Sequence, residues 1–215
     1  MRKKYIHYLI VASVMIVLLI GCRSTTPTTA TTTPNLQPAF KSFKDYPDHA
    51  FNLREYIQGM TKGGHNILIW RDPSVNLRNY RSVTLVDFDG RFLPVQHVFS
   101  YDPFINSFNA NLKSSLKLPR EKSSNALRIE GAVVECNPGN RAARYWAGLY
   151  GAGKAGGAVI CEVYEPGKSR PCIRIYTRDT ASVAWFGGNS VAMLNNIFYS
   201  VADRLSAALN TRLSH

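Results

Sequence analysis

A glycine-rich segment, residues 148–157, has the spacing of two phosphate-binding motifs. It reads Gly-Leu-Tyr-Gly-Ala-Gly-Lys-Ala-Gly-Gly, which fits both G-x-G-x-x-G and G-x-x-x-x-G-K. Both motifs bind phosphate through a helix that follows at once, because its N-terminal amides face the anion. Here a β-rich run follows at residues 158–163, and Ala155 stands where magnesium binding needs Ser or Thr. We therefore predict that residues 137–157 connect two strands and bind no nucleotide.

The histidines and acidic residues give no second set with catalytic or metal-binding spacing. His65 and His97 are isolated from each other and from the cysteines. Asp87 and Asp89 alternate at the end of a predicted strand, and no further carboxylate cluster supports them as an acid–base pair. The G-x-S-x-G motif of a nucleophile elbow is also missing. The sequence therefore predicts no catalytic residue, metal ligand or cofactor, and it leaves enzymatic activity an open question.

Cys161 and Cys172 flank a turn at residues 165–168 and could form a disulfide across a hairpin. The apolar positions on either side of the turn argue against this bridge. They are Val159, Cys161 and Val163 before the turn, and Ile173 and Ile175 after it. Pairing these apolar faces places Cys172 on the opposite side of the sheet, whereas a slip of one residue would allow the bridge. We predict free thiols at Cys161, Cys172 and Cys136, with a disulfide as the alternative.

The N-terminus has the pattern of a secretory signal that ends at a cysteine. Basic residues 2–4 precede a mainly apolar run, residues 8–20, which is short for a transmembrane helix. Residues 19–22, Leu-Ile-Gly-Cys, resemble the lipobox of bacterial lipoproteins. That resemblance implies cleavage before Cys22 and its lipidation, with an uncleaved anchor as the alternative. Arg23 occupies the position after the cysteine, where an aspartate would favour retention in the inner membrane. In a Gram-negative host we therefore expect the protein to be anchored in the outer membrane, facing the periplasm.

Composition divides the chain into three parts. We predict a signal peptide at residues 1–21, a lipidated Cys22 with a disordered Thr/Pro tether at residues 22–38, and a single globular domain at residues 40–210. The chain carries 26 basic and 14 acidic residues, for a formal net charge of +12, and no run of basic residues marks a patch. A secreted lipoprotein rarely meets nucleic acid, so we expect anionic phospholipid or the cell wall to be the partner of the basic residues. The alternative is an ordinary basic surface that serves solubility.

The apolar periodicity predicts the elements that must position these residues. Helices are expected from Asp48 to the residues before Gly63, from Asp102 to those before Pro119, and near residues 189–209. Strands are expected at residues 66–70, 82–88, 125–136, 157–165 and 171–179, with Leu127, Ile129, Gly131 and Val133 pointing inward. Consecutive strands between helices predict an α+β or mixed α/β fold, in which helices pack on a largely antiparallel or mixed sheet.

Residues 137–155 and the strand after them resemble the signature of an uncharacterised bacterial lipoprotein family, domain of unknown function 4410. The matching stretches are Asn-Pro-Gly-Asn-Arg-Ala-Ala-Arg at residues 137–144, Gly148, and Gly-Ala-Gly-Lys-Ala at residues 151–155. Residues 72–83 are similar to a segment of related lipoproteins, so the resemblance covers residues 71–209. It implies no catalytic residue. A looser analogy to envelope lipoproteins that activate synthases or build secretion pores implies an assembly or scaffolding role.

Two functions follow, and they predict different surfaces. The first is a membrane-anchored, non-enzymatic binding, scaffolding or assembly factor for an envelope protein or cell-wall component. Its partner would bind side chains of the glycine-rich segment and the residues before it. These are Arg141, Arg144, Tyr145, Trp146 and Tyr150. The alternative is a periplasmic enzyme or small-ligand carrier with a pocket near that segment; an enzyme would gather polar groups in a cleft, whereas a binder would expose an apolar or aromatic patch.

Overall fold

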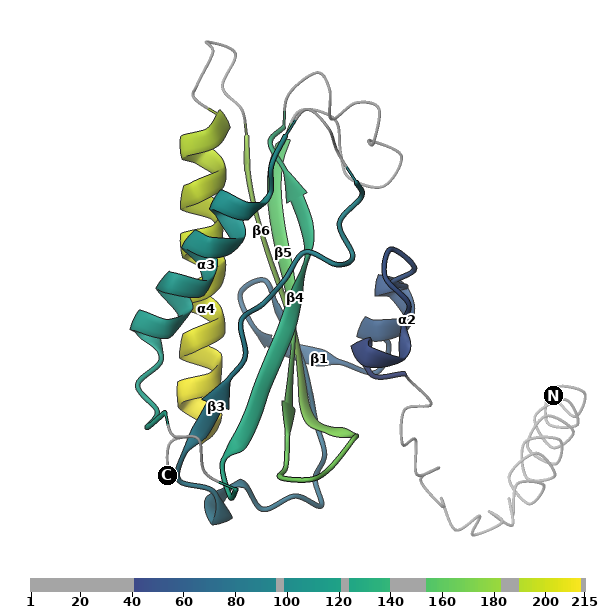
Figure 1. Cartoon of the computed structure of the whole chain (residues 1–215), viewed down its shortest axis with the longest axis vertical. Helices are drawn as coiled ribbons and strands as arrows, with labels where there is room; N and C mark the ends of the chain where they lie inside the picture. Colours follow the sequence, from purple (N-terminus) through teal and green to yellow (C-terminus); the bar gives the residue numbers. More distant parts are fainter. Residues whose placement is uncertain (1–40, 96–98, 121–123, 140–153, 183–189, 214–215) are drawn as a thin grey trace, which may run out of the picture. The chain divides into compact units, whose positions relative to one another are not determined.

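The computed structural model describes the chain at residues 41–95, 99–120, 124–139, 154–182 and 190–213. These stretches form a six-stranded sheet with the order β1-β2-β6-β5-β4-β3 (Figure 1). The strands are β1 (Thr61–Gly64), β2 (Ile67–Arg71), β3 (Val83–Leu85), β4 (Leu127–Asn137), β5 (Lys154–Tyr164) and β6 (Pro171–Ser182). Within this sheet β3 and β4 are parallel and the other neighbouring pairs are antiparallel. The mixed sheet with packed helices confirms the predicted α+β class.

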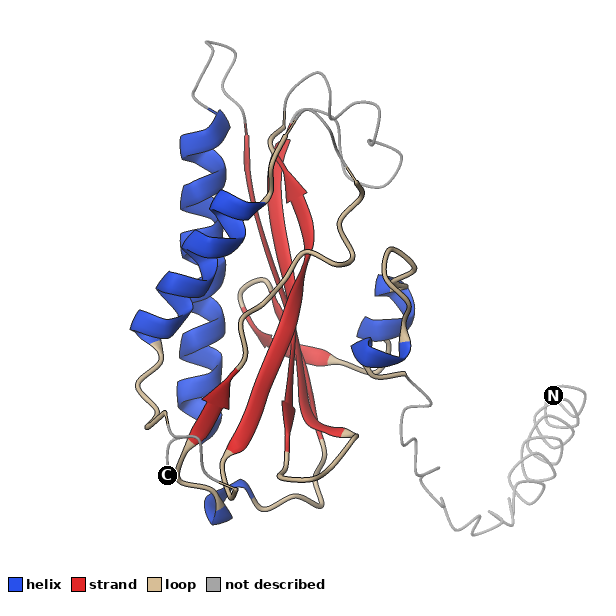
Figure 2. Cartoon of the chain, in the orientation of Figure 1, coloured by secondary structure: helices blue, strands red, loops and turns tan. Residues whose placement is uncertain are grey.

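Two long helices, α3 (Asp102–Ser115) and α4 (Ser190–Leu213), pack on one face of the sheet (Figure 2). The strands turn alternate residues toward them, as predicted for β4, where Ile129 and Val133 are fully buried. From the helices, Phe108 and Phe198 meet edge to face with ring centroids 6.3 Å apart. Each large apolar side chain buried in this way stabilises the fold by roughly 1.5–3 kcal/mol. This helix-covered side therefore holds the main core.

The opposite face of the sheet carries a short N-terminal segment (Figure 2). Its elements are a 3-10 helix, η1 (Phe43–Asp45), and a single-turn helix, α2 (Leu53–Ile57). The Asn52 side chain caps α2 by accepting a hydrogen bond from its third amide. Aromatic rings fill the space beneath, and Phe51 stacks on Phe92 with centroids 4.7 Å apart. The sheet is thus covered on both faces, with the smaller aromatic core under the N-terminal segment.

The N-terminal helix is shorter than the apolar pattern predicts, and a strand follows it. The pattern from Asp48 predicted one helix that ends before Gly63, but α2 ends at Ile57 and β1 begins at Thr61. Asn66, with a φ of 58°, forms the turn that folds β1 back on β2. Pairing with β2 supplies the backbone amides and carbonyls of β1 with the hydrogen-bond partners that a longer helix would have supplied. The strand predicted at residues 82–88 is likewise reduced to the three residues of β3.

β5 and β6 pair in the register predicted from their apolar faces, since Cys161 opposes Ile175. The described cysteines are buried free thiols, as predicted. They are Cys136, Cys161 and Cys172. One detail of the prediction is wrong: a register shift before Tyr164 places Cys172 in the main core and not on the face of the polar residues. The thiols therefore serve as small apolar side chains.

Candidate functional site

The side chains predicted to carry a lipid or contact a partner lie outside the described residues. They are Cys22, Arg141, Arg144, Tyr145, Trp146 and Tyr150. Their roles remain predictions. The described residues contain two other features on the sheet face opposite to α3 and α4. One is a network of buried ion pairs, and the other is a groove beside it.

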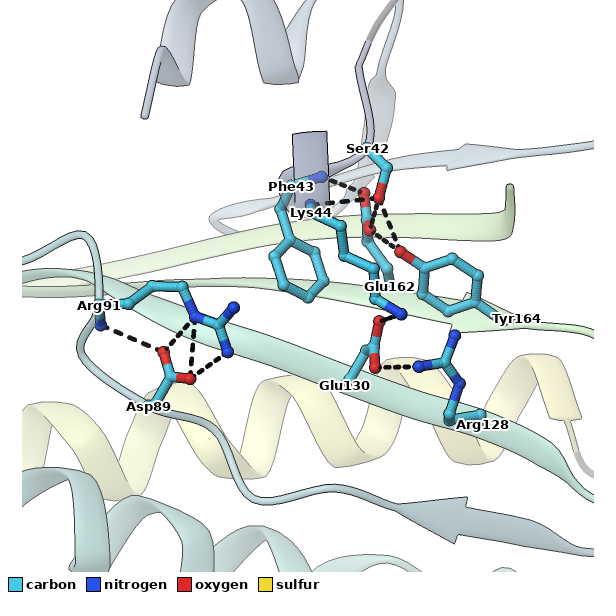
Figure 3. A network of polar contacts seen from close by, with 9 residues as sticks. All are labelled: Ser42, Phe43, Lys44, Asp89, Arg91, Arg128, Glu130, Glu162 and Tyr164. Atoms are coloured by element: carbon cyan, nitrogen blue, oxygen red, sulfur yellow. Dashed lines mark hydrogen bonds and ion pairs between the residues drawn. The ribbon is translucent and has the colours of Figure 1, made fainter. Parts of the chain in front are cut away.

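A buried carboxylate, Glu162 in β5, holds the start of the folded domain on the sheet (Figure 3). The Ser42 hydroxyl donates a hydrogen bond to Glu162 Oε2 at 2.7 Å, and the Phe43 amide donates to Oε1 at 3.2 Å. Tyr164, on the same face of β5, donates its hydroxyl to Oε2 and lies 2.7 Å from Ser42 Oγ. Glu162 is fully buried in the centre of the sheet. These bonds therefore fix residues 42–43 at a central strand.

Arg174 in β6 supplies the positive charge beside Glu162. Its Nε lies 3.6 Å from Glu162 Oε1, and its Nη2 donates to the Tyr56 carbonyl at 2.6 Å. The guanidinium also lies 4.1 Å from the centre of the Tyr56 ring. Burial raises the pKa of Glu162, although the hydroxyls of Tyr164 and Ser42 and the charge of Arg174 act in the opposite direction. Removing one partner from such a pair costs more than the pair contributes, because a charge is left buried alone.

A second buried carboxylate, Glu130 in β4, binds two basic residues (Figure 3). Lys44 Nζ lies 2.6 Å from Glu130 Oε1, and Arg128 pairs with Oε2. Both cations also lie over the Tyr164 ring, at 4.6 and 4.5 Å from its centre. Lys44 belongs to η1, so this ion pair is a second link between the N-terminal segment and the sheet.

A third buried carboxylate, Glu135 in β4, lies where the glycine-rich segment joins the sheet. It accepts two hydrogen bonds from Arg178, at 2.6 Å from Nε and 2.9 Å from Nη2. Gly156 of β5 leaves room for this carboxylate, because a Cβ there would lie 2.2 Å from Glu135 Oε1. The last glycine of the G-x-G-x-x-G spacing thus has a packing role.

The glycine-rich segment is followed by a strand, as predicted, but this strand begins at Lys154 and not at Gly157, so the predicted connection of residues 137–157 is too long. β4 ends at Asn137 and β5 begins at Lys154, so the residues after Gly153 form a strand. A helix N-terminus is what both phosphate motifs require at this place. The part of the connection at residues 140–153 lies outside the described residues.

A groove of about 390 Å³ crosses β1, β2 and β6 beside this network. Leu68 and Tyr176 line it together with the polar side chains of Lys62, Arg178 and Thr180. Thr180 pairs with Gly156 of β5, so the groove lies next to the start of that strand. Its volume is within the range of small-molecule sites. The groove thus lies beside the part of the chain where the sequence predicted a ligand pocket.

The ion pairs were missed in the sequence, although a signal for them was present. Charged residues recur on one face of two strands, two positions apart in Arg128 and Glu130 and four positions apart in Arg174 and Arg178. Such alternation indicates a face away from the main core, but it does not indicate that a further segment buries that face. Within the described residues no three His, Cys, Asp or Glu are arranged to hold a metal ion. No helix of the described part is long and apolar enough to cross a membrane.

Comparisons with known proteins give only distant likenesses. No family model and no curated protein match the chain. The PelC dodecamer from Paraburkholderia phytofirmans has a TM-score of 0.41 and 14% identity, covering 66% of this chain and 96% of PelC. A minor lipoprotein from Acinetobacter baumannii has a TM-score of 0.36 and 13% identity, and the match covers 63% of this chain and 93% of that lipoprotein. A candidate lipoprotein from Caulobacter crescentus has a TM-score of 0.35 and 12% identity, and the match covers 64% of this chain and 91% of that protein. Likenesses this distant assign no function to the chain.

Proposed function

We propose that this chain is a membrane-anchored envelope lipoprotein of the type called domain of unknown function 4410. The pattern of residues 1–21 and the Leu-Ile-Gly-Cys sequence support lipidation of Cys22, at the outer membrane facing the periplasm. The folded domain acts as a non-enzymatic binding, scaffolding or assembly factor for an envelope protein or a cell-wall component. Residues 23–38, mostly Thr and Pro, are the tether between the lipid and the domain.

The observation that carries this proposal is the burial of the chain just after the Thr/Pro stretch. The first residues of a domain usually fray unless they are tied down. Here Ser42 is 8% exposed and Phe43 is 2% exposed, and both bind Glu162. β5, which carries Glu162, lies between β4 and β6. Tension on the N-terminus is therefore transmitted to the centre of the sheet, which suits a domain held by an N-terminal lipid.

The acidic side chains of this face support a structural role over a catalytic one. Glu130, Glu135 and Glu162 are all buried, and each faces at least one Lys or Arg. A general acid or base must reach the substrate proton within hydrogen-bond distance. Glu162 instead joins β5 to β6, and Glu135 joins β4 to β6 across β5. Glu130 and Glu162 also hold the N-terminal segment.

The groove favours a second function, a small-ligand carrier or enzyme in the periplasm. It combines the side chains of Leu68 and Tyr176 with the charged side chains of Lys62, Arg178 and Asp179, and it lies beside the start of β5. Sites of this size that bind small molecules usually have such a lining. Leu68→Arg would fill the groove with a charged chain. It should abolish binding of a carried ligand but leave partner capture by a scaffolding protein unchanged.

Membrane anchoring is tested by Cys22→Ser. The altered chain should move from the membrane fraction to the soluble periplasmic fraction, because it has lost its acyl chains. Cys172→Ala is the matched control, since it also removes one cysteine and should leave the chain in the membrane. If the Cys22→Ser chain stays in the membrane and resists an alkaline wash, the lipoprotein proposal is wrong.

Partner binding is tested by cross-linking the full chain in its envelope and identifying the captured protein or glycan. Changing Tyr145 and Trp146 together to Ala should abolish the main cross-linked product. Tyr199→Ala removes an exposed tyrosine of α4 and is the control. If the product persists when Tyr145 and Trp146 are changed but is lost in Tyr199→Ala, the partner binds the helical face and not the predicted site.

A further inference from the structure

The fold gathers positive charge at one end of the sheet. Three segments meet there: residues 71–82, 117–120 and 165–170, here called the cationic end. Together they carry seven Lys or Arg and two Asp or Glu, whereas the other described residues carry twelve basic and eleven acidic residues. The cationic end thus holds five of the six excess positive charges of the described residues.

Backbone and side-chain bonds join the three segments. The Asp72 amide donates to the Cys172 carbonyl at 2.8 Å, which links the chain after β2 to the start of β6. The Tyr80 hydroxyl donates to Glu165 at 2.7 Å, and the Val83 amide donates to the Pro119 carbonyl at 2.9 Å. In Figure 1 the β5–β6 turn, the start of β4 and the last turn of α4 lie together at the lower end.

The basic side chains at the cationic end face solvent. All seven are exposed, and none forms an ion pair with a described carboxylate. The two acids of this end are half-buried: Asp72 accepts hydrogen bonds from Ser74, and Glu165 accepts one from Tyr80. The field of the cationic end is therefore directed outward.

The membrane-linked N-terminus joins the domain next to this end. Ser42 contacts Tyr164, and Tyr164 is the last residue of β5 before the turn at residues 165–170. The first described residues of the domain, which follow the proposed tether in the sequence, therefore lie beside the cationic end. A short tether keeps the domain near its membrane, which raises the effective concentration of the surface for any patch that faces it.

We propose that the cationic end docks on an anionic phospholipid surface, namely the membrane that carries the anchor. This inference rests on the membrane anchoring proposed above. Each Lys or Arg close to an anionic bilayer strengthens binding about fivefold, and the attraction falls off within a Debye length of about 10 Å at 0.1 M salt. Docking orients the domain, so that Lys154, at the opposite end of β5, faces away from the membrane.

Vesicle binding by the unlipidated mature chain tests the docking separately from the anchor. The chain from residue 22 onward, with Ser in place of Cys22, is mixed with phosphatidylcholine vesicles that either contain or lack phosphatidylglycerol. We expect it to float with the anionic vesicles only. Changing Arg78, Lys168 and Arg170 to Gln should weaken binding about 100-fold, and salt near 1 M should abolish binding by the unaltered chain.

A matched variant separates position from net charge. Arg54, Lys62 and Lys154 are exposed basic residues outside the cationic end, and changing all three to Gln alters the net charge equally. This variant should bind almost as tightly as the unaltered chain, and both variants should keep its thermal transition. Equal weakening by the two variants would overturn the docking site, as would binding to pure phosphatidylcholine. No vesicle binding, or binding to an anionic glycan alone, would also overturn it while leaving the anchoring result untouched.

Discussion

Ser42 and Glu162 are 120 residues apart in the chain, yet the Ser42 hydroxyl donates a hydrogen bond to the Glu162 carboxylate at 2.7 Å. This bond joins the first described turn of the domain to a central strand. Since Ser42 Oγ also lies 2.7 Å from the Tyr164 hydroxyl, its loss would affect two buried polar groups at once. The start of the domain is thus a structural element and not a frayed end.

The first prediction is that Ser42→Ala lowers the free energy of unfolding by about 1–3 kcal/mol, the usual cost of removing a hydrogen bond to a buried charged group. Urea unfolding of the mature chain measures this change. Ser74→Ala is the control, because the Ser74 hydroxyl also donates to a carboxylate, Asp72, but at an exposed site. A loss at Ser42 no larger than that at Ser74 would mean that the N-terminal segment is not held through Glu162.

The element order, the sheet class and the inward residues of β4 could be predicted because each depends on local apolar alternation. β1 could not, because Thr61–Gly64 has no apolar pattern and forms a strand only by pairing with β2. The buried ion pairs depend on contacts such as that between Lys44 and Glu130, which no periodicity indicates. The cationic end was missed for the same reason, since three separate segments supply its charges and no run of basic residues marks it.

The second prediction concerns pH. Burial raises the pKa of Glu162 in the folded chain above its ordinary value, so the folded state binds this proton more tightly than the unfolded state does. The contribution of Glu162 to stability is therefore greatest below the ordinary carboxyl range and decreases as pH rises through the raised pKa. Glu162→Gln removes the titrating group, so its free energy of unfolding should fall less steeply with pH over that interval. Below the ordinary carboxyl range the two chains should differ by a constant amount, and equal slopes throughout would refute the assignment.

The third prediction is that the three described thiols are unreactive in the folded chain. Burial raises the pKa of Cys172 to about 12 and also raises the pKa values of Cys136 and Cys161 well above the ordinary thiol value, so almost no thiolate is present near neutral pH. In the Cys22→Ser chain, a thiol reagent at pH 8 should label none of the three until denaturant is added, and then all three. Fewer than three labelled thiols after unfolding would reveal a disulfide, and rapid labelling before it would contradict their burial.

The fourth prediction concerns Gly156→Ala, which tests whether this glycine of the phosphate-like spacing serves packing. The added Cβ would lie 2.2 Å from Glu135 Oε1, and two hydrogen bonds from Arg178 hold that carboxylate in place. The substitution must therefore displace the ion pair, and we expect a loss of about 1–3 kcal/mol in the free energy of unfolding, as for other overpacked sites.

A double-mutant cycle with Glu135→Ala shows whether the two side chains compete for the same space. Removing the carboxylate leaves room for the new methyl group, so Gly156→Ala should cost much less in the Glu135→Ala chain than in the unaltered one. Equal costs in both backgrounds would mean that Gly156 is required for its backbone alone. Saturable ATP binding by the unaltered chain, lost in Lys154→Ala, would instead return the segment to phosphate binding, because Lys154 is the lysine of its G-x-x-x-x-G-K spacing.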